Sequence, residues 1–443
     1  MPATRTAELA SRIAENIERI DAYTSLKDTP PVSFDASASD FPLYDQEIDA
    51  ARQVVLDATD ELHALMLGPV GMLTSPSHNF LISLQAICRF GLANAFPDGK
   101  DEATFDEIAS ISGLGESYVR RILRHAMTYR IFCEPRKGLV AHTSASKHLA
   151  TDLPTRQWIG MIAEEMWPAA AGVGGAPYST ESESGLAYLI HKQTVEAMVK
   201  WPGSEEPTHS GFNLAHNTSE TVFAALSRSP MRAERYAAAM SWFSTGPGLE
   251  MTHILEALRW ESLVDGVVVD VGGSYGSICV TLARNHPSLK FIVQDRPEVI
   301  VAGRQQLPQE LDDRVTFLEH DFFDDQPVRG ADVYILRWIL HDWSDQYAIK
   351  ILRALIPALK EGAKVLINEI ILPEPGSSTP YHERKLRSFD MAMLEFHNGK
   401  ERDMDDWRQL FISADPNYHI LGVTQPAGSR LGFIEVGWRT AET

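Results

Sequence analysis

The stretch Val267–Ser277, with the sequence VVVDVGGSYGS, decides which fold the last third of the chain is expected to adopt. Its first residues predict a buried strand, and its glycines lie where that strand turns into a helix. Further apolar runs follow at residues 291–294, 315–319, 333–336 and 364–370, with helical stretches between them. Such an alternation predicts an α/β fold with a parallel, doubly wound sheet. Two runs near the end, at 419–424 and 432–438, predict an antiparallel pair added at one edge.

The ends of the first three predicted strands carry residues suited to a nucleoside. The glycines from Gly272 onward let a ligand approach the backbone, but they lack the G-x-G-x-x-G spacing that cradles a pyrophosphate. Asp295, 23 residues after Gly272, can accept hydrogen bonds from both ribose hydroxyls, although it could also cap the next helix. Asp321 and Phe322 end the third run and suit an adenine amino group and ring. The set predicts S-adenosyl-L-methionine rather than NAD.

The stretch Leu336–Asp345, LRWILHDWSD, places His341 just beyond the fourth predicted strand. Glu369 ends the fifth strand, and Glu401 lies in HNGKERD, just before a further helix. Carboxylates beside an imidazole fix its tautomer and raise its basicity, as a general base requires. The pattern therefore predicts that His341 is a base. The alternative is a structural histidine at the edge of the core.

Composition narrows the possible partners and compartments. The 443 residues include 40 Lys and Arg against 60 Asp and Glu, a net charge of −20. This charge repels phosphate backbones and anionic surfaces, so neither nucleic acid nor a membrane is expected as a partner. Three scattered cysteines without a C-x-x-C pair argue against disulfides and structural zinc, and no metal is expected. With no signal peptide or apolar run long enough to span a bilayer, a cytoplasmic location is expected.

The first part of the chain shows helical periodicity. Residues 6–21 predict an amphipathic helix, 25–45 a loop or tether, and 46–95 further helices. Residues 103–143 combine a short helix, a Gly-Leu-Gly turn, a basic helix and a two-stranded wing, which predicts a winged helix. The net charge disfavours DNA binding by this motif, and winged helices also serve as protein–protein modules. Residues 150–260 are rich in Met and aromatics, which favours either core packing or a pocket for a planar ligand.

Six motifs together carry a family resemblance. VDVGGSYG, the position of Asp295, HDFF, LRWILHDWSD, NEIILPEPG and NGKERDMDDW resemble the caffeate-type class I O-methyltransferases, especially fungal members that methylate polyketide phenols. The resemblance runs from about residue 55 to the C-terminus. It implies a homodimer with a Rossmann-like methyltransferase domain and an N-terminal, all-helical, winged-helix dimerisation region. The chain departs from the plant pattern at Ser274-Tyr275, at Arg296 and at Arg337, where an arginine replaces a lysine with a different donor geometry.

The resemblance also implies roles for individual residues. His341 takes the phenol proton, and Glu369 and Glu401 hold it. Contacts with S-adenosyl-L-methionine are implied for Gly272, Gly273, Gly276, Asp295, Arg296, Asp321, Phe322 and Arg337. The substrate pocket is expected to be lined by Met161, Met166, Trp167, Met240, Phe243, Asp342, Met393 and His397.

These expectations divide the chain into four parts. They are an N-terminal helix and tether (1–54), a winged-helix dimerisation domain (55–150), a helical pocket and linker region (151–260) and the Rossmann-like S-adenosyl-L-methionine-binding domain (261–443). The predicted reaction is O-methylation of a phenolic or enolic hydroxyl of a small, polyketide-like metabolite. Two alternatives stay open: a pericyclase or dehydratase that binds S-adenosyl-L-methionine on the same fold, and a non-catalytic winged-helix regulator. The complete set of His341, Glu369 and Glu401 favours methyl transfer.

Overall fold

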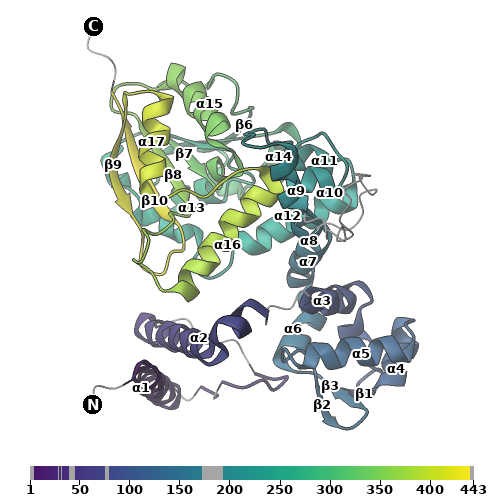
Figure 1. The fold of residues 1–443 in the computed structure, drawn as a ribbon. Helices are drawn as coiled ribbons and strands as arrows, with labels where there is room; N and C mark the ends of the chain where they lie inside the picture. The colour runs from purple at the N-terminus through teal and green to yellow at the C-terminus, as the bar shows by residue number, and fades with distance from the viewer. Residues whose placement is uncertain are drawn as a thin grey trace, which may run out of the picture. The chain divides into compact units, whose positions relative to one another are not determined.

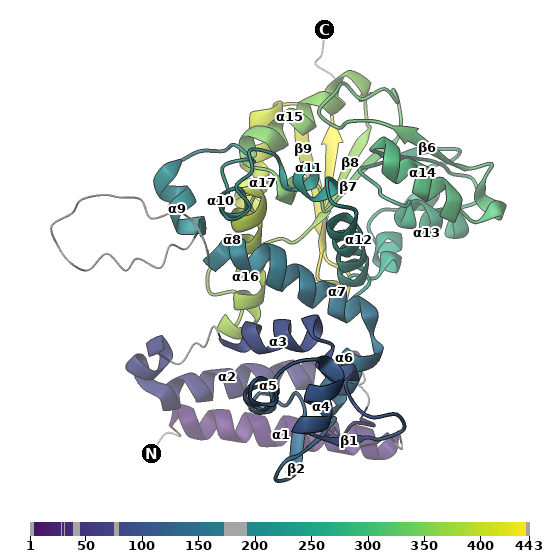
Figure 2. The ribbon, with the colours of Figure 1, turned by 90° about the vertical axis from the view of Figure 1, so that its right-hand side faces the viewer.

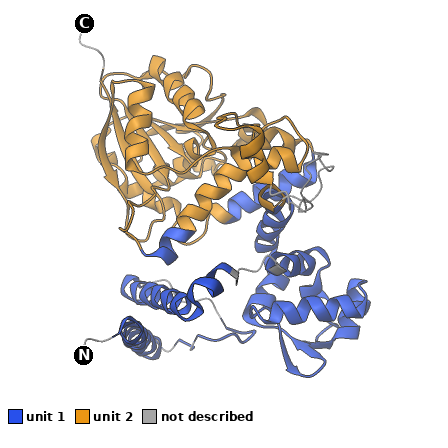
Figure 3. Cartoon of the chain, viewed as in Figure 1, with its two compact units in different colours: residues 1–167, 229–242, 379–384 blue, residues 168–228, 243–378, 385–443 orange. Residues whose placement is uncertain are grey.

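The computed structural model describes residues 4–27, 29–30, 32–38, 45–74, 79–171 and 193–439. The chain forms two compact units, coloured separately in Figure 3. The first comprises residues 1–167, 229–242 and 379–384, and the second comprises 168–228, 243–378 and 385–443. The four-part division expected from the sequence stays a prediction.

The first unit is mainly helical (Figure 1). Its helices are α1 (Arg5–Leu26), α2 (Gln46–Thr74), α3 (Asn79–Arg89), α4 (Phe105–Ser112), α5 (Glu116–Met127), α6 (Ser144–Thr151), α7 (Leu153–Met161) and, later in the chain, α12 (Pro230–Ser244). The long helices α1 and α2 lie side by side in Figures 1 and 2. Gly68, with φ of 65°, breaks the helical path of α2 just before Pro69, a residue that lacks the N–H needed for a helical hydrogen bond.

A winged helix lies within the first unit, as predicted. Helices α4 and α5 pack beside a three-stranded sheet made of β1 (Glu102–Thr104), β2 (Cys133–Arg136) and β3 (Leu139–Ala141), in the order β1-β3-β2. The strand β1 adds to the two-stranded wing expected from the sequence. Thr104 and Glu107 form a capping box that starts α4, because each side chain accepts a hydrogen bond from the other residue's backbone N–H. Gly113 ends α4 in the left-handed conformation that favours glycine.

The second unit is built on a seven-stranded sheet with the order β6-β5-β4-β7-β8-β10-β9. The strands are β4 (Val267–Val271), β5 (Lys290–Asp295), β6 (Val315–Glu319), β7 (Val333–Arg337), β8 (Lys364–Glu369), β9 (Tyr418–Thr424) and β10 (Gly432–Trp438). The strands from β4 to β8 pair in parallel, whereas β10 pairs antiparallel with both β8 and β9. The predicted doubly wound sheet and its antiparallel addition are therefore confirmed.

Both faces of this sheet are covered. Alternate strand residues, such as Val269 and Leu336, pack in one core cluster with α15 (Asp345–Leu355) and α17 (Met404–Ala414). Their neighbours, such as Val268 and Ile335, pack in a second cluster with α13 (Ser277–Asn285) and α14 (Pro297–Gln306). This division follows from the two-residue period of a strand. The other helices of the unit are α8 (Trp167–Ala171), α9 (Gln193–Lys200), α10 (Gly211–Ala215), α11 (Val222–Ser227) and α16 (Pro380–His397).

The topology brings the carboxyl ends of the five parallel strands to one edge of the sheet, where ligands bind in open α/β folds. The predicted cofactor and base residues follow these strand ends. In the described part of the chain, no helix has the length and apolar character needed to cross a bilayer.

Candidate active site

The turn after β4 is pressed closely against its surroundings. A side chain at Gly272, whose φ is 71°, would place its Cβ 2.4 Å from Cδ1 of Ile339. A side chain at Gly273 would place its Cβ 2.5 Å from the carboxylate of buried Asp270. Gly276 also has a positive φ, and it starts α13. Side chains at these positions would meet neighbouring protein atoms, so the close packing of this turn requires glycine.

Two carboxylates stand beside this turn at the next strand ends. Asp295, at the end of β5, accepts hydrogen bonds from the backbone N–H of Ser274 at 2.9 Å and of Arg296 at 2.8 Å. Burial raises the pKa of Asp295, and these backbone hydrogen bonds oppose the rise. Asp321, beyond β6, accepts from the N–H of Phe323 at 3.0 Å and is otherwise exposed. Each carboxylate keeps acceptor capacity for a ligand.

These groups fit an adenosyl ligand. The ring of Phe322 lies close to the turn, because its Cδ1 would be 3.9 Å from a Cβ at Gly272. Acceptors for ribose hydroxyls, an acceptor for an adenine amino group and a flat apolar ring thus gather at one sheet edge. The predicted residues Gly272, Gly273, Gly276, Asp295, Asp321 and Phe322 therefore lie where they could hold S-adenosyl-L-methionine, and their contacts with it stay a prediction.

The two predicted cofactor arginines have protein partners of their own. The guanidinium of Arg337, at the end of β7, donates to Oδ1 of Asn368 at 2.7 Å and to the carbonyl of Leu249 at 2.8 Å. Burial lowers the pKa of Arg337 to about 10, against the opposing charge of Asp270. Arg296 pairs with Glu298 on the surface. Their cofactor contacts stay predictions.

His341 lies in a short 3-10 turn, Leu340–Asp342, directly after β7. Glu369, at the end of β8, holds this turn, since its Oε1 accepts the backbone N–H of Ile339 at 3.0 Å and of Leu340 at 2.6 Å. Its Oε2 is buried and has no partner among the described residues. The contacts of Glu369 are thus with the backbone that carries His341 rather than with the ring, and its predicted hold on the ring stays a prediction.

The ring of His341 is bound by Glu401. Its Nδ1 lies 2.8 Å from Oε1 of Glu401, and both side chains are buried. Burial alone would lower the pKa of His341, but Asp342, Glu401 and Glu369 outweigh it and raise the pKa to about 10. Burial raises the pKa of Glu369 to about 7. The arrangement fixes the tautomer and gives the ring a high proton affinity.

The Nε2 side of the ring faces a second histidine across a carboxylate. Oδ1 of Asp342 lies 3.5 Å from Nε2 of His341 and 3.5 Å from Nε2 of His397, at the end of α16. Burial is the main reason that the pKa of His397 is lowered. Two of the predicted pocket residues, Asp342 and His397, are therefore next to the predicted base. Met393 lies one turn before His397, and its carbonyl accepts the N–H of Gly399.

Aromatic rings extend from the base. The ring centroid of Trp338 lies 4.8 Å from that of His341, and Phe243 lies 5.7 Å from Trp338 and 5.3 Å from Phe389. Trp338 was not predicted, although it stands within LRWILHDWSD, and its φ of 54° is unusual for a bulky residue. Phe389 was also missed, since it carries no signal beyond its place in α16.

The remaining predicted pocket residues, Met161, Met166, Trp167 and Met240, belong to the first unit. Met161 is buried, and the other three are partly buried. Residues 162–166 form a π-helical turn, a feature that often marks functional positions in helices. Their part in a substrate pocket stays a prediction.

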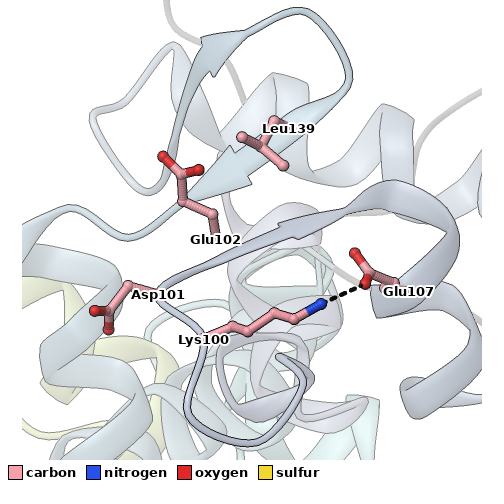
Figure 4. A pocket seen from close by; sticks show the side chains of 5 residues that line it. All are labelled: Lys100, Asp101, Glu102, Glu107 and Leu139. Carbon is pink, nitrogen blue, oxygen red and sulfur yellow. Dashed lines mark hydrogen bonds and ion pairs between the residues drawn. The ribbon is translucent and has the colours of Figure 1, made fainter.

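A surface pocket beside the small sheet of the first unit holds none of the predicted residues (Figure 4). It is lined by Lys100, Asp101, Glu102, Glu107 and Leu139. Lys100 donates to Glu107 at 3.1 Å, and such an exposed pair contributes little binding chemistry. Within the described ranges, no cluster of His, Cys, Asp and Glu suits a metal ion.

Comparisons with known proteins identify the family of the chain. The O-methyltransferase domain family matches residues 199–415. The chain is 37% identical over 440 residues to the grayanic acid biosynthesis cluster O-methyltransferase of Cladonia grayi, covering 99% of this chain and 88% of that protein. It is also 37% identical over 447 residues to the chlorophenol O-methyltransferase of Trichoderma longibrachiatum, covering 98% and 90%.

Solved structures share the fold. A protein described as a pericyclic reaction enzyme superposes with a TM-score of 0.69 at 21% identity, covering 96% of this chain and 100% of that one. Other structures of the same fold contain S-adenosylmethionine or S-adenosylhomocysteine. The relatives, which are fungal, and the matching domain family show that the chain belongs to the class I O-methyltransferases and is an S-adenosyl-L-methionine-dependent enzyme.

Proposed function

We propose that this O-methyltransferase methylates a phenolic or enolic hydroxyl of a small, polyketide-like metabolite, with His341 as the general base. The observation that carries the proposal is the 2.8 Å contact between Nδ1 of His341 and buried Glu401. A carboxylate on Nδ1 leaves Nε2 as the nitrogen that can accept a proton. This is the tautomer that a base in the acceptor pocket requires.

The chemistry is a proton removal coupled to nucleophilic attack. When bound, S-adenosyl-L-methionine supplies an electrophilic methyl carbon on a positively charged sulfonium. The acceptor hydroxyl, with a pKa of about 10 for a simple phenol, gives its proton to Nε2 of His341. Glu401, Asp342 and Glu369 stabilise the imidazolium that results. Assistance of this kind contributes about 10²–10⁴-fold, and alignment of the reacting atoms contributes on the order of 7 kcal/mol or more.

The proposed acceptor is a flat ring. Trp338, Phe243 and Phe389 continue from His341 as a series of neighbouring aromatic rings, and Phe223 lies 5.0 Å from His397 between ring centroids. Such walls suit planar ligands with few polar groups. The name of the Trichoderma relative gives a chlorinated phenol as its substrate, which supports a phenolic acceptor here.

A pericyclase or dehydratase remains the second candidate, because the fold is shared with a pericyclic reaction enzyme. Such an enzyme would bind S-adenosyl-L-methionine and leave its methyl group in place. The buried base with its carboxylates supports methyl transfer, since a hydroxyl must lose its proton in that reaction.

The test is incubation with labelled S-adenosyl-L-methionine and a panel of phenols, enols and polyketide phenols, with the matching methyl ethers as controls. We expect S-adenosylhomocysteine and a labelled methyl ether from at least one free hydroxyl, and neither from its blocked counterpart. Binding of S-adenosyl-L-methionine with isomerised or dehydrated product and no S-adenosylhomocysteine would instead support the second candidate.

We also propose a homodimer. Several large apolar side chains on the last part of α2 and on α3 are exposed, namely Leu65, Met66, Val70, Met72, Leu73 and Ile82. Apolar patches of this kind commonly mark interfaces. Light scattering at micromolar concentration should give twice the chain mass, and the monomer mass would contradict the proposal.

We also propose that the protein acts in the cytoplasm, as the sequence predicts.

A further inference from the structure

The loop after α16 packs directly on the turn that carries His341. A Cβ at Gly399 would lie 2.3 Å from the carbonyl oxygen of His341 and 2.7 Å from the carbonyl carbon of Asp342. The N–H of Lys400 donates to the His341 carbonyl at 3.0 Å. Glu401 then reaches the ring. Residues 399–402, which we call the clamp loop, are therefore in contact with both the backbone and the ring of the base.

Arg402, the last residue of the clamp loop, holds the backbone on both sides of His341. Its Nη1 donates to the carbonyl of Leu340 and its Nη2 to the carbonyl of Trp343, each at 2.9 Å. Its Nε donates to Oδ1 of Asp345 at 2.9 Å, at the start of α15. One rigid guanidinium thus joins the residue before His341, the residue two after it and the next helix.

The burial of this cation is unusual enough to need a reason. The side chain of Arg402 is completely buried, whereas its carboxylate partner Asp345 is 43% exposed. A buried charge carries a desolvation cost of several kcal/mol, and apolar residues of similar volume often stabilise a fold as well or better. A guanidinium differs from them in fixing several acceptors in one plane, and here those acceptors are the backbone of the turn that carries His341.

Glu369 and Arg402 contact different backbone groups of the turn that carries His341. Glu369 accepts the backbone N–H groups of Ile339 and Leu340, while Arg402 donates to the carbonyls of Leu340 and Trp343. The turn is thereby held from its donor side and from its acceptor side. Because Glu401 directly precedes Arg402, a shift of this arginine would also move the carboxylate that orients the ring.

We propose that Arg402 is a positioning residue for catalysis: its guanidinium sets the distance between His341 and Glu401 by fixing the backbone of both. The inference rests on the proposed role of His341 as the base. It assigns Arg402 no contact with substrate or cofactor, so its effect should fall on turnover and on the titration of His341 rather than on binding.

The test is Arg402→Lys, which keeps the positive charge but cannot reach all three acceptors from a single ammonium group. The titratable groups that act on the His341 ring are Asp342 on its own turn, Glu401 from the clamp loop and Glu369 from β8, and His397 from α16 lies beside the same Asp342. Lys400 and Arg402 contact the backbone of the turn. Since all charges are conserved, a shift in the pH profile reports geometry. We expect turnover to fall by about tenfold or more, the acid limb of the profile to move toward pH 6.5, and KM for S-adenosyl-L-methionine to stay within about twofold of wild type.

Arg353→Lys is the matched control. The guanidinium of Arg353 also donates to two backbone carbonyls, those of Ala414 at 3.0 Å and Ser413 at 2.8 Å, and it does not touch the turn that carries His341. We expect its turnover and profile to match wild type. If Arg402→Lys fails to fold, Asp345→Glu is measured in its place, because it keeps the charge but displaces the partly exposed carboxylate that holds Arg402, and we expect a smaller loss of turnover with a shift in the same direction.

The proposal would be overturned if Arg402→Lys showed wild-type turnover and an unshifted acid limb. If Arg402→Lys cannot be folded, an unshifted acid limb in Asp345→Glu would overturn it. His341→Ala, measured in parallel, separates the two levels of inference. If that variant retains full turnover, the proposed base is wrong. If it loses turnover while the clamp variants behave as wild type, only the role of Arg402 is wrong.

Discussion

Two buried ionic clusters, one in each unit, show opposite designs. In the first unit, Glu165 accepts Nε and Nη2 of Arg232 at 2.9 and 2.6 Å and Nη2 of Arg235 at 2.7 Å, and Glu164 also pairs with Arg235. Arg89 also pairs with Glu164, at 3.3 Å, so every carboxylate of this cluster is paired with arginine. The hydrogen bond with Glu165 raises the pKa of Arg232, because a carboxylate stabilises the charged guanidinium.

The carboxylates of the cluster in the second unit gather around a histidine instead. Asp342, Glu369 and Glu401 surround His341, and an oxygen of each glutamate is buried without a partner among the described residues. The pKa values of His341 and Glu369 move to about 10 and about 7. Carboxylates paired with arginines hold helices together, whereas carboxylates gathered around a histidine shift its pKa, which is typical of functional sites. The two clusters should therefore fail in different ways when mutated.

The largest effect is expected from His341→Ala. Turnover should fall by roughly 10²-fold or more, because no other group takes the phenol proton at that position. Affinity for S-adenosyl-L-methionine should barely change. S-adenosylhomocysteine release and calorimetry measure the two quantities, and His419→Ala, on β9, serves as the control histidine. Equal release from both variants would make His341 a structural histidine.

Mutation of the arginine-paired cluster in the first unit should instead lower the stability of the fold. Glu165→Ala leaves two guanidinium groups without their shared carboxylate, and breaking such a pair costs about 3 kcal/mol where the arginines keep some solvent contact. The loss should appear in thermal or denaturant unfolding, with turnover of the folded protein within a few-fold of wild type. Glu61→Ala, which breaks the exposed pair with Arg5, should cost much less. If Glu165→Ala lost much of its turnover and none of its stability, the contrast between the two clusters would be wrong.

Asp295 is a third carboxylate site, and its mutation should affect cofactor binding rather than turnover chemistry or stability. This carboxylate is held by backbone N–H groups, so its remaining acceptor capacity is available to the ribose. Asp295→Ala should weaken binding of S-adenosyl-L-methionine by about 1.5–3 kcal/mol. Calorimetry measures this directly, with Glu298→Ala as the neighbouring control. Unchanged affinity in a folded Asp295→Ala protein would remove Asp295 from the cofactor site.

The smallest effect is the pH dependence of turnover. A protonated ring cannot accept a proton, and the nearby carboxylates raise the pKa of His341; turnover should therefore fall with decreasing pH, by about tenfold per unit below an apparent pKa above 6.5. Glu401→Gln removes one of the raising charges and should move this acid limb to lower pH. Identical limbs in the two proteins, or a wild-type midpoint at or below 6.5, would contradict the assignment.

Much of the fold and part of the site could be predicted from local signals. Apolar alternation and glycine placement marked every strand of the large sheet to within two residues, because burial imposes a two-residue period on any strand. The residues that follow the strand ends, such as Asp295 and His341, came from the same pattern. The third strand of the winged helix was missed, since Glu102–Thr104 is short and gains its pairing from Leu139–Ala141.

The sequence by itself determined which residues stand at the carboxyl edge of the sheet and that a histidine lies among acidic residues there. Only the tertiary structure decided their partners. Glu401 meets the ring while Glu369 holds the backbone of the turn, and Arg402 donates to that turn from 59 and 62 residues away along the chain. The physical reason is that burial is a local property of the chain. A hydrogen-bond partner depends on where distant segments pack, and here the close fit of Gly399 against His341 sets that position.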